Sequence, residues 1–161
     1  MKKKIFKKID NHKALVSIVC VTYNQENYIE NCLKGFLIQN TSFNFEIIVS
    51  DDASTDKTPQ VIKNYSSKYP NIIKPIFHKS NIGMAKNFYQ TMSLAKSKYI
   101  AFCDGDDYWS DKSKLQLQVD FLENNQDYGL VYTNIDVYDE NNNFFYKKIF
   151  ENSKKTNLYR S

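Results

Sequence analysis

The sequence predicts an α/β domain with a mostly parallel sheet and helices on both faces, and three observations support this prediction. Runs of β-branched residues alternate along the chain with segments whose apolar residues recur at helical spacing. Most of the predicted strands are continuously apolar, as in strands that are buried on both faces. The first four predicted strands each lead into polar residues, and the carboxyl ends of parallel strands are where such sheets bind ligands.

The first half of the chain contains two predicted strand–helix pairs. Residues 15–21 predict a buried strand, and from Glu26 the apolar residues recur at helical spacing until about residue 39. Residues 45–50 predict the second strand. Pro59 suits the first turn of the helix that follows it.

The second half continues this alternation. Residues 71–77 predict a weaker third strand, and Pro75 favours an edge position for it. The remaining predicted elements are a helix marked by Met84, Phe88, Met92 and Ala95, a buried strand over 99–103, a helix carrying Leu115, Val119 and Leu122, a fifth strand over 130–138 and a hairpin partner over 144–150.

The composition is that of one folded domain. The chain has 161 residues, of which 42% are hydrophobic, so it can bury a core. It contains no 18-residue apolar run that could span a membrane, and no apolar segment of a secretory signal follows the basic N-terminus. Three cysteines without metal-like spacing fit a reducing compartment. We therefore expect a cytoplasmic protein.

The formal net charge of +4 comes partly from the two ends of the chain, while the interior carries both signs. A solvated terminus is the plainer interpretation of the basic ends, and contact with the inner face of an anionic membrane is the alternative. We expect a basic extension over 1–14, one domain over 15–150 and a tail over 151–161, and no nucleic-acid partner. The sequence makes no prediction about the oligomeric state.

The first candidate site follows the predicted fourth strand, where Asp104, Asp106 and Asp107 crowd around Gly105. Like charges this close are unfavourable unless a cation lies between them. Asp104 and Asp106 offer oxygen ligands that suit Mg²⁺ or Mn²⁺, with water and a phosphate-bearing ligand completing the coordination shell. A solvated acidic turn that begins a helix is the alternative.

The glycine pattern narrows the ligand class. The four glycines form neither G-x-G-x-x-G nor G-x-x-x-x-G-K, so a bound phosphate would depend on a metal at the acidic loop, helped by Lys86. Asp52 could accept hydrogen bonds from a base or a ribose hydroxyl, and Tyr23 could pack on the base. The alternatives are an Asx turn at Asp52 and a half-buried core ring at Tyr23.

Four segments, in order, resemble the signatures of family 2 glycosyltransferases with the GT-A fold. They are Val16–Asn24, Phe45–Asp56, Asn81–Asn87 and Tyr99–Asp107. The resemblance implies metal-dependent transfer of a sugar from a nucleotide diphosphosugar, commonly a UDP-sugar, with inversion at the anomeric carbon. It further implies a glycan or a lipid-linked sugar as the acceptor.

The same resemblance implies which residues bind the nucleotide sugar. Thr22, Tyr23 and Glu26 would line the nucleotide pocket, Asp52 would meet the uracil, and Asn81 would belong to the same site.

It also implies how the charged groups are held. Lys86 would approach the diphosphate, and Asp104 and Asp106 would form the D-x-D pair. In that pair Asp106 is the more direct metal ligand and Asp104 lies nearer the ribose.

The catalytic base of such enzymes has no match in this sequence and is expected beyond Ser161. Asp136 and Asp139 are interpreted as strand-end and turn residues, and Trp109 as a sugar-stacking ring or an anchor of the metal loop. Three hypotheses therefore stand: a glycosyltransferase whose acceptor half is missing or lies in another chain, a non-catalytic nucleotide-sugar-binding module, and a metal-dependent phosphohydrolase or nucleotidyltransferase. The third is weaker, because the first strand ends in Thr-Tyr-Asn where an aspartyl nucleophile would be needed.

Overall fold

The structure is a computed structural model that describes residues 13–139 and 144–146. Its contacts divide the chain into two compact units, residues 1–115 and residues 116–161, which are described separately. The predicted ends of the domain, at residues 15 and 150, stay predictions, since the basic extension up to residue 12 and the tail from residue 147 lie outside the described residues.

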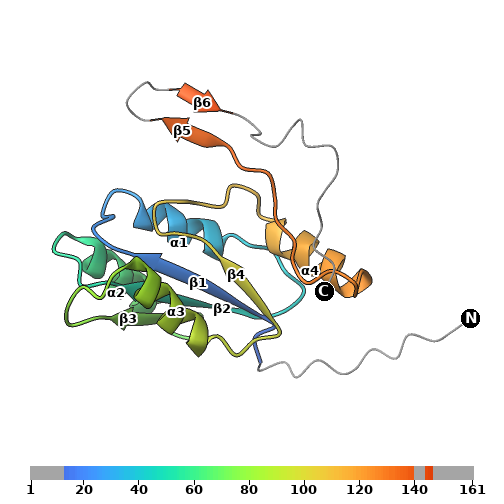
Figure 1. Cartoon of the computed structure of the whole chain (residues 1–161), viewed down its shortest axis with the longest axis horizontal. Helices are drawn as coiled ribbons and strands as arrows, with labels where there is room; N and C mark the ends of the chain where they lie inside the picture. Colours follow the sequence, from blue (N-terminus) through green and yellow to red (C-terminus); the bar gives the residue numbers. More distant parts are fainter. Residues whose placement is uncertain (1–12, 140–143, 147–161) are drawn as a thin grey trace, which may run out of the picture. The chain divides into compact units, whose positions relative to one another are not determined.

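The first unit contains a four-stranded parallel sheet in the order β3-β2-β1-β4 (Figure 1). In register, Val16 of β1 lies opposite Phe45 of β2, and Thr22 lies opposite Asp51. The sheet confirms the predicted parallel arrangement. Its strands are β1 (Val16–Thr22), β2 (Phe45–Asp51), β3 (Ile73–Phe77) and β4 (Tyr99–Phe102).

Helices cover both faces of this sheet, as predicted. The helices α1 (Ile29–Leu37) and α2 (Thr58–Lys68) share one face, where the Tyr65 hydroxyl of α2 donates to Glu30 of α1 over 3.0 Å. The helix α3 (Met84–Leu94) packs on β1 and β2 from the other face (Figure 1).

The core lies around the two central strands. Every residue of β1 is buried, as are Ile47 and Val49 of β2 and Leu33 and Phe36 of α1. Burying each of these large apolar side chains contributes roughly 1.5–3 kcal/mol. This core holds the carboxyl ends of β1 and β2 at one edge of the sheet.

The helix α3 begins at Met84, the first residue of its predicted pattern, and ends at Leu94, just before the last, Ala95. It buries polar residues against the sheet. Asn87 and Thr91 are each 1% exposed, whereas Met84 is 76% exposed. The cause is a hydrogen-bond network, in which Asn87 Oδ1 accepts from Ser50 Oγ over 2.6 Å and lies 3.1 Å from His78 Nε2. Of the apolar residues that marked this helix in the sequence, Met84 is exposed, whereas Phe88 is half-buried and its ring meets Phe102 of β4 edge-on, with the centroids 4.7 Å apart.

The strand β4 differs from the predicted buried strand. Ile100 is 44% exposed and Phe102 is 47% exposed. Within the described residues β4 pairs with β1 alone, so it is an edge of the sheet and part of its surface is uncovered. The opposite edge is β3, where Pro75 was predicted to favour such a position.

The second unit contains a hairpin rather than the predicted fifth strand. The strands β5 (Val137–Asp139) and β6 (Phe144–Tyr146) pair antiparallel, which confirms the hairpin for residues 144–146. The strand predicted over 130–138 is wrong for residues 130–136, which have no regular structure, because in the described part only Val137 onward has a partner strand. Residues 147–150 of the predicted partner lie outside the described residues.

The helix α4 (Lys114–Asn124) begins at the end of the first unit, and Leu115 and Val119 are buried as its pattern predicted. Among the helices that the structure describes, none has the length and apolarity needed to cross a membrane.

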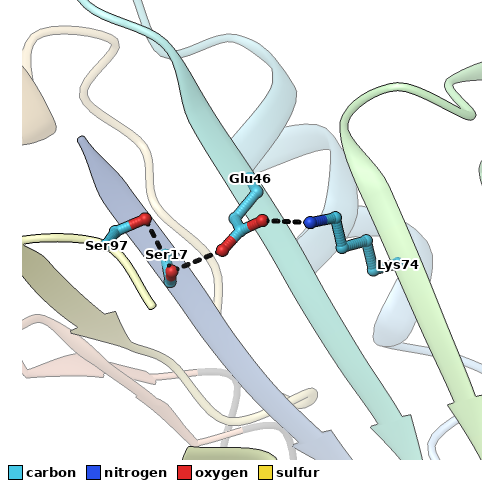
Figure 2. Close-up of polar contacts among 4 residues, drawn as sticks. All are labelled: Ser17, Glu46, Lys74 and Ser97. Carbon is cyan, nitrogen blue, oxygen red and sulfur yellow. Dashed lines mark hydrogen bonds and ion pairs between the residues drawn. The ribbon is translucent and has the colours of Figure 1, made fainter. Parts of the chain in front are cut away.

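A polar network joins the amino ends of three strands. The Ser17 hydroxyl donates to Glu46 Oε1 over 2.6 Å, Lys74 pairs with the same carboxylate, and Ser97 Oγ lies 2.8 Å from Ser17 Oγ (Figure 2). Burial raises the pKa of Glu46, but the hydrogen bonds from Lys74 and Ser17 outweigh burial and leave the pKa below its ordinary value. The network lies at the opposite end of the strands from the candidate site.

Candidate functional site

Two loops that follow β1 and β2 are joined by hydrogen bonds. Asn24 N donates to Ser54 Oγ over 2.8 Å, and Asn24 Oδ1 accepts from Thr55 N over 2.9 Å. Asn24 and Ala53 adopt left-handed backbone angles, with φ of 52° and 60°. Such angles cost free energy and are retained only where the surroundings impose them, so the loops have one well-defined shape.

Glu26 belongs to this junction. Its carboxylate accepts a hydrogen bond from Lys57 N, the N-cap residue of α2, over 2.8 Å, and Glu26 N donates to Asp56 Oδ2 over 3.0 Å. A carboxylate at a helix N-terminus also interacts favourably with the helix dipole. The structure thus gives Glu26 a structural role at α2 beside its predicted place in the nucleotide pocket.

Thr22 lies at the carboxyl end of β1 against the acidic loop. It is 4% exposed, and its hydroxyl donates to Gln25 Oε1 over 2.6 Å. A Cβ atom on Gly105 would lie 2.7 Å from Thr22 Cβ and 2.8 Å from Thr22 Oγ1, so only glycine fits there. The contact brings two segments together that are far apart in sequence.

Tyr23 follows directly and is 45% exposed. Of the two interpretations of Tyr23, this exposure favours a ring that packs on the base over a half-buried core ring. An exposed aromatic ring beside a polar strand end can stack on a base.

Asp52 fixes the loop that precedes α3. It is 2% exposed, and its two carboxylate oxygens accept from Ile82 N over 2.8 Å and from Gly83 N over 2.9 Å. Asn81 Oδ1 also accepts from Gly83 N, over 3.0 Å. Asp52 thus ties two distant segments together rather than forming a local Asx turn, and it sets the start of the helix whose first turn carries the exposed Lys86.

The acidic loop concentrates negative charge. Burial raises the pKa of Asp104, and the charges of Asp106 and Asp107 raise it further. Burial and the charge of Asp106 also raise the pKa of Asp107. Asp106 is exposed. The loop is held by Asp107 N, which donates to Asp104 O over 3.1 Å, and by the Cys32 thiol, 3.4 Å from the same oxygen.

A divalent cation fits this loop by its chemistry. No group of three or more His, Cys, Asp or Glu side chains that could hold a metal ion exists within the described residues. Asp104 and Asp106 alone would leave most of the coordination shell to water and to the oxygens of a ligand, as Mg²⁺ prefers. A cation here would relieve the repulsion that raises the pKa of Asp104.

Trp109 anchors the end of the acidic loop. Its side chain is 7% exposed and meets the Phe36 ring edge-on, with the centroids 4.8 Å apart. Lys114 Nζ lies 4.7 Å from the centroid of the indole ring, which is within the range of cation–π attraction. Of the two predicted roles, the structure favours the anchor over the sugar-stacking ring.

Gln39 is a supporting residue that the sequence did not indicate. Its Nε2 donates to Gly35 O over 3.1 Å and to Asp111 O over 2.9 Å, and its Oε1 accepts from Leu115 N over 3.0 Å. A glutamine near a helix end carries no signal for such a role in one sequence.

Asp51 is a second residue that was not singled out from its neighbour. It is 2% exposed, its Oδ2 accepts from Ser54 N over 3.1 Å, and its Oδ1 has no partner among the described residues. In the sequence, the two consecutive carboxylates at the end of β2 were the signal that could have indicated Asp51. The structure shows that the two side chains make different contacts.

Comparison with known proteins identifies the family. The model for "Glycosyl transferase family 2" matches residues 17–161. The chain belongs to glycosyl transferase family 2. This confirms the family that the sequence motifs resemble.

The chain is also similar to individual proteins and solved structures. An uncharacterised protein of Mycobacterium tuberculosis is 48% identical over 108 residues, which are 67% of this chain and 31% of that protein. The structure of Staphylococcus aureus TarS 1-349 has a TM-score of 0.60 and 29% identity, covering 69% of this chain and 33% of that one. This glycosyltransferase family 2 chain thus spans about a third of the length of each.

The GT-A fold is confirmed by the solved structures. A mannosyltransferase from Pyrobaculum calidifontis, solved with GDP-Man and Mn²⁺, has a TM-score of 0.61 and 24% identity, covering 68% of this chain and 32% of that one. TarS 1-349 has also been solved with UDP and with UDP-GlcNAc.

Proposed function

We propose that this family 2 glycosyltransferase uses a UDP-sugar as donor and transfers the sugar to a glycan or a lipid-linked acceptor with inversion. The observation that carries the proposal is the convergence of three loops: Thr22 meets Gly105 of the acidic loop, and Asp52 holds the residues that precede Lys86. The UDP and UDP-GlcNAc complexes of TarS 1-349, which is 29% identical, support uridine as the nucleoside.

In this proposal the loops of β1 and β2 bind the nucleoside. The exposed ring of Tyr23 stacks on the uracil. Each Asp52 oxygen accepts one backbone hydrogen bond, and a carboxylate oxygen has lone pairs for a further one, so Asp52 can also accept from the base N–H. In the same proposal Asn81 and Thr22 lie at the border of this nucleoside-binding site.

The diphosphate is assigned to the acidic loop and to α3. Asp104 and Asp106 would hold Mg²⁺ or Mn²⁺, and a bound cation would act as a Lewis acid that stabilises the charge of the departing diphosphate. Lys86 projects from the first turn of α3 and is exposed, so it can reach a phosphate oxygen.

The transfer step requires a base for the acceptor. The acceptor hydroxyl forms a bond to the anomeric carbon from the side opposite the diphosphate, loses its proton to the base, and the bond to the diphosphate breaks. We assign the base to a carboxylate beyond Ser161 and the activity to the cytoplasm, in keeping with the three buried, free cysteines.

A non-catalytic nucleotide-sugar-binding module is the second candidate function. It is favoured by the described residues, which supply the proposed donor site and to none of which we assign the general base. The two candidates share the donor site and differ in turnover alone.

Calorimetric titration of the 161-residue chain with UDP, with Mn²⁺ and then with a chelator, tests the proposal. Metal-dependent binding is the expected result, with GDP and ADP as comparison nucleotides. Equal binding of all three nucleotides, or none, would overturn the uridine assignment. Transfer or hydrolysis of UDP-sugars by the same sample separates the enzyme from the binding module.

A further inference from the structure

Charge is segregated along the chain. Residues 14–56 contain six acidic residues and one lysine, and residues 104–139 contain nine acidic residues and two lysines. Residues 57–103 contain no acidic residue. They contain eight lysines, all of which are exposed: Lys57, Lys63, Lys68, Lys74, Lys79, Lys86, Lys96 and Lys98.

These lysines lie on both faces of the sheet. Lys63 and Lys68 belong to α2, on the face shared with α1. Lys86 belongs to α3, on the other face, and Lys96 and Lys98 belong to the turn that follows α3, where Ser97 meets Ser17 at the amino end of β1. Charge alone therefore does not distinguish the two faces.

Exposed apolar side chains distinguish them. Along α3, Met84 and Tyr89 are each 76% exposed and Leu94 is 51% exposed, while the neighbouring Ile100 of β4 is 44% exposed. On the side of α1 and α2 the exposed large hydrophobic side chains of the described residues are fewer. They are Ile38 at the end of α1, which is 50% exposed, and Phe77 of β3, which is 37% exposed and lies under Lys63 Nζ.

We propose that residues 89–98, which comprise the second half of α3 and the turn after it, form a surface that binds an anionic membrane. Lys96 and Lys98 would face the lipid headgroups, where a polybasic segment is attracted to the negative surface potential. Tyr89 and Leu94 would enter the boundary between headgroups and acyl chains, as the apolar side chains of interfacial helices do. A soluble polyanion would use the lysines and leave these apolar side chains in water.

The proposal differs from the expectation that the basic ends contact the membrane, since those ends lie outside the described residues. It does not depend on the proposed transferase activity, because the vesicle assay below involves neither nucleotide nor metal.

Co-sedimentation of the full chain with vesicles tests the surface. The vesicles contain phosphatidylcholine alone or with about one third phosphatidylglycerol, enough to give a negative surface potential. The variant Lys96→Gln/Lys98→Gln is expected to bind the anionic vesicles roughly 10- to 30-fold more weakly than the parent chain. The variant Tyr89→Ser/Leu94→Ser should also bind them more weakly.

The matched control is Lys63→Gln/Lys68→Gln, which removes the same charge from the opposite face and should bind nearly as the parent does. All variants keep the basic ends, and their far-UV circular dichroism should match that of the parent because every substituted side chain is exposed. Equal losses in the two lysine variants, or no preference of the parent for anionic vesicles, would overturn the proposal. Polyphosphate binding that depends on Lys96 and Lys98, with vesicle binding unaffected by the Tyr89/Leu94 pair, would overturn it in favour of a soluble polyanion.

Discussion

Gly35 of α1 lies against the main chain of Trp109, at a distance that leaves no room for a side chain. A Cβ atom at residue 35 would come within 2.8 Å of both Trp109 N and Trp109 O. Gln39, one turn further along the sequence, donates to Gly35 O and to Asp111 O. The helix and the end of the acidic loop are therefore fitted to each other at main-chain level.

We expect Gly35→Ala to destabilise the chain by about 1–3 kcal/mol, because the new methyl group must displace main-chain atoms. Urea unfolding measures the loss. Trp109 is the only tryptophan of the chain, so its fluorescence also reports displacement of the loop. Alanine is the better helix former by about 1 kcal/mol, so a variant more stable than the parent would show that the contact is loose.

The control for this experiment is Gly129→Ala. No atom lies within 4 Å of the position of its added Cβ. We expect a change within about 0.5 kcal/mol, as for ordinary surface substitutions, and an unchanged tryptophan emission.

Asp106→Ala should abolish metal-dependent UDP binding and leave the fold intact. Asp106 is exposed, so its removal creates no cavity, whereas it takes one of two oxygen ligands from the proposed cation. Calorimetry with Mn²⁺ and with chelator measures the effect, and Asp127→Ala, at another exposed carboxylate, is the control. A variant whose UDP affinity keeps the full Mn²⁺ dependence would remove Asp106 from the metal site.

Asp52→Asn should weaken UDP and uridine binding both with and without metal. Asparagine keeps one acceptor oxygen but turns an NH₂ group toward a backbone N–H of residues 82–83, which costs about 1–3 kcal/mol when buried. Titration with uridine separates this effect from the diphosphate. An unchanged uridine affinity, together with lower stability in urea, would limit Asp52 to holding the loop.

Glu46→Gln tests a pH dependence at the other end of the sheet. The pKa of Glu46 is lowered in the folded state, so its ionisation stabilises the fold above its unfolded pKa of about 4.3, and this stabilisation is lost as the pH falls through the folded value. Glutamine does not titrate. The difference in unfolding free energy between parent and variant should therefore be larger at neutral pH than in acid, and a difference that is constant with pH would contradict the assignment.

The sequence predicted the elements of the first unit well because each carries its own local signal. The continuous apolar runs of β1 and β2, the turn signals between elements and Pro59 in the first turn of α2 all depend on neighbouring residues. The burial of the polar residues Asn87 and Thr91 on α3 did not follow from such a signal. Periodicity selects the apolar residues, whereas the hydrogen bonds of Asn87 with Ser50 depend on a strand 37 positions away.

The predicted fifth strand shows a second limit. Residues 130–136 have strand-like composition, but a strand also needs a backbone to pair with, and within the described residues pairing begins at Val137. The site residues show a third limit of prediction from the sequence. The positions of Glu26 and Asp52 at strand ends were predictable, but the backbone amides that their carboxylates bind belong to segments about 30 positions away.

The cross-linked loops after β1 and β2 bear on the entropy of ligand binding. Their main chains are already held by Ser54 Oγ, Asn24 Oδ1 and the carboxylates of Glu26 and Asp56 before any ligand arrives. The conformational freedom of these segments is therefore lost when the protein folds and not when a nucleotide binds. The amide hydrogens of Asn24, Glu26, Thr55 and Lys57, which make these bonds, should accordingly exchange slowly in the free protein. Their exchange should change little when the protein is saturated with nucleotide. The binding enthalpy would then report new contacts rather than loop ordering.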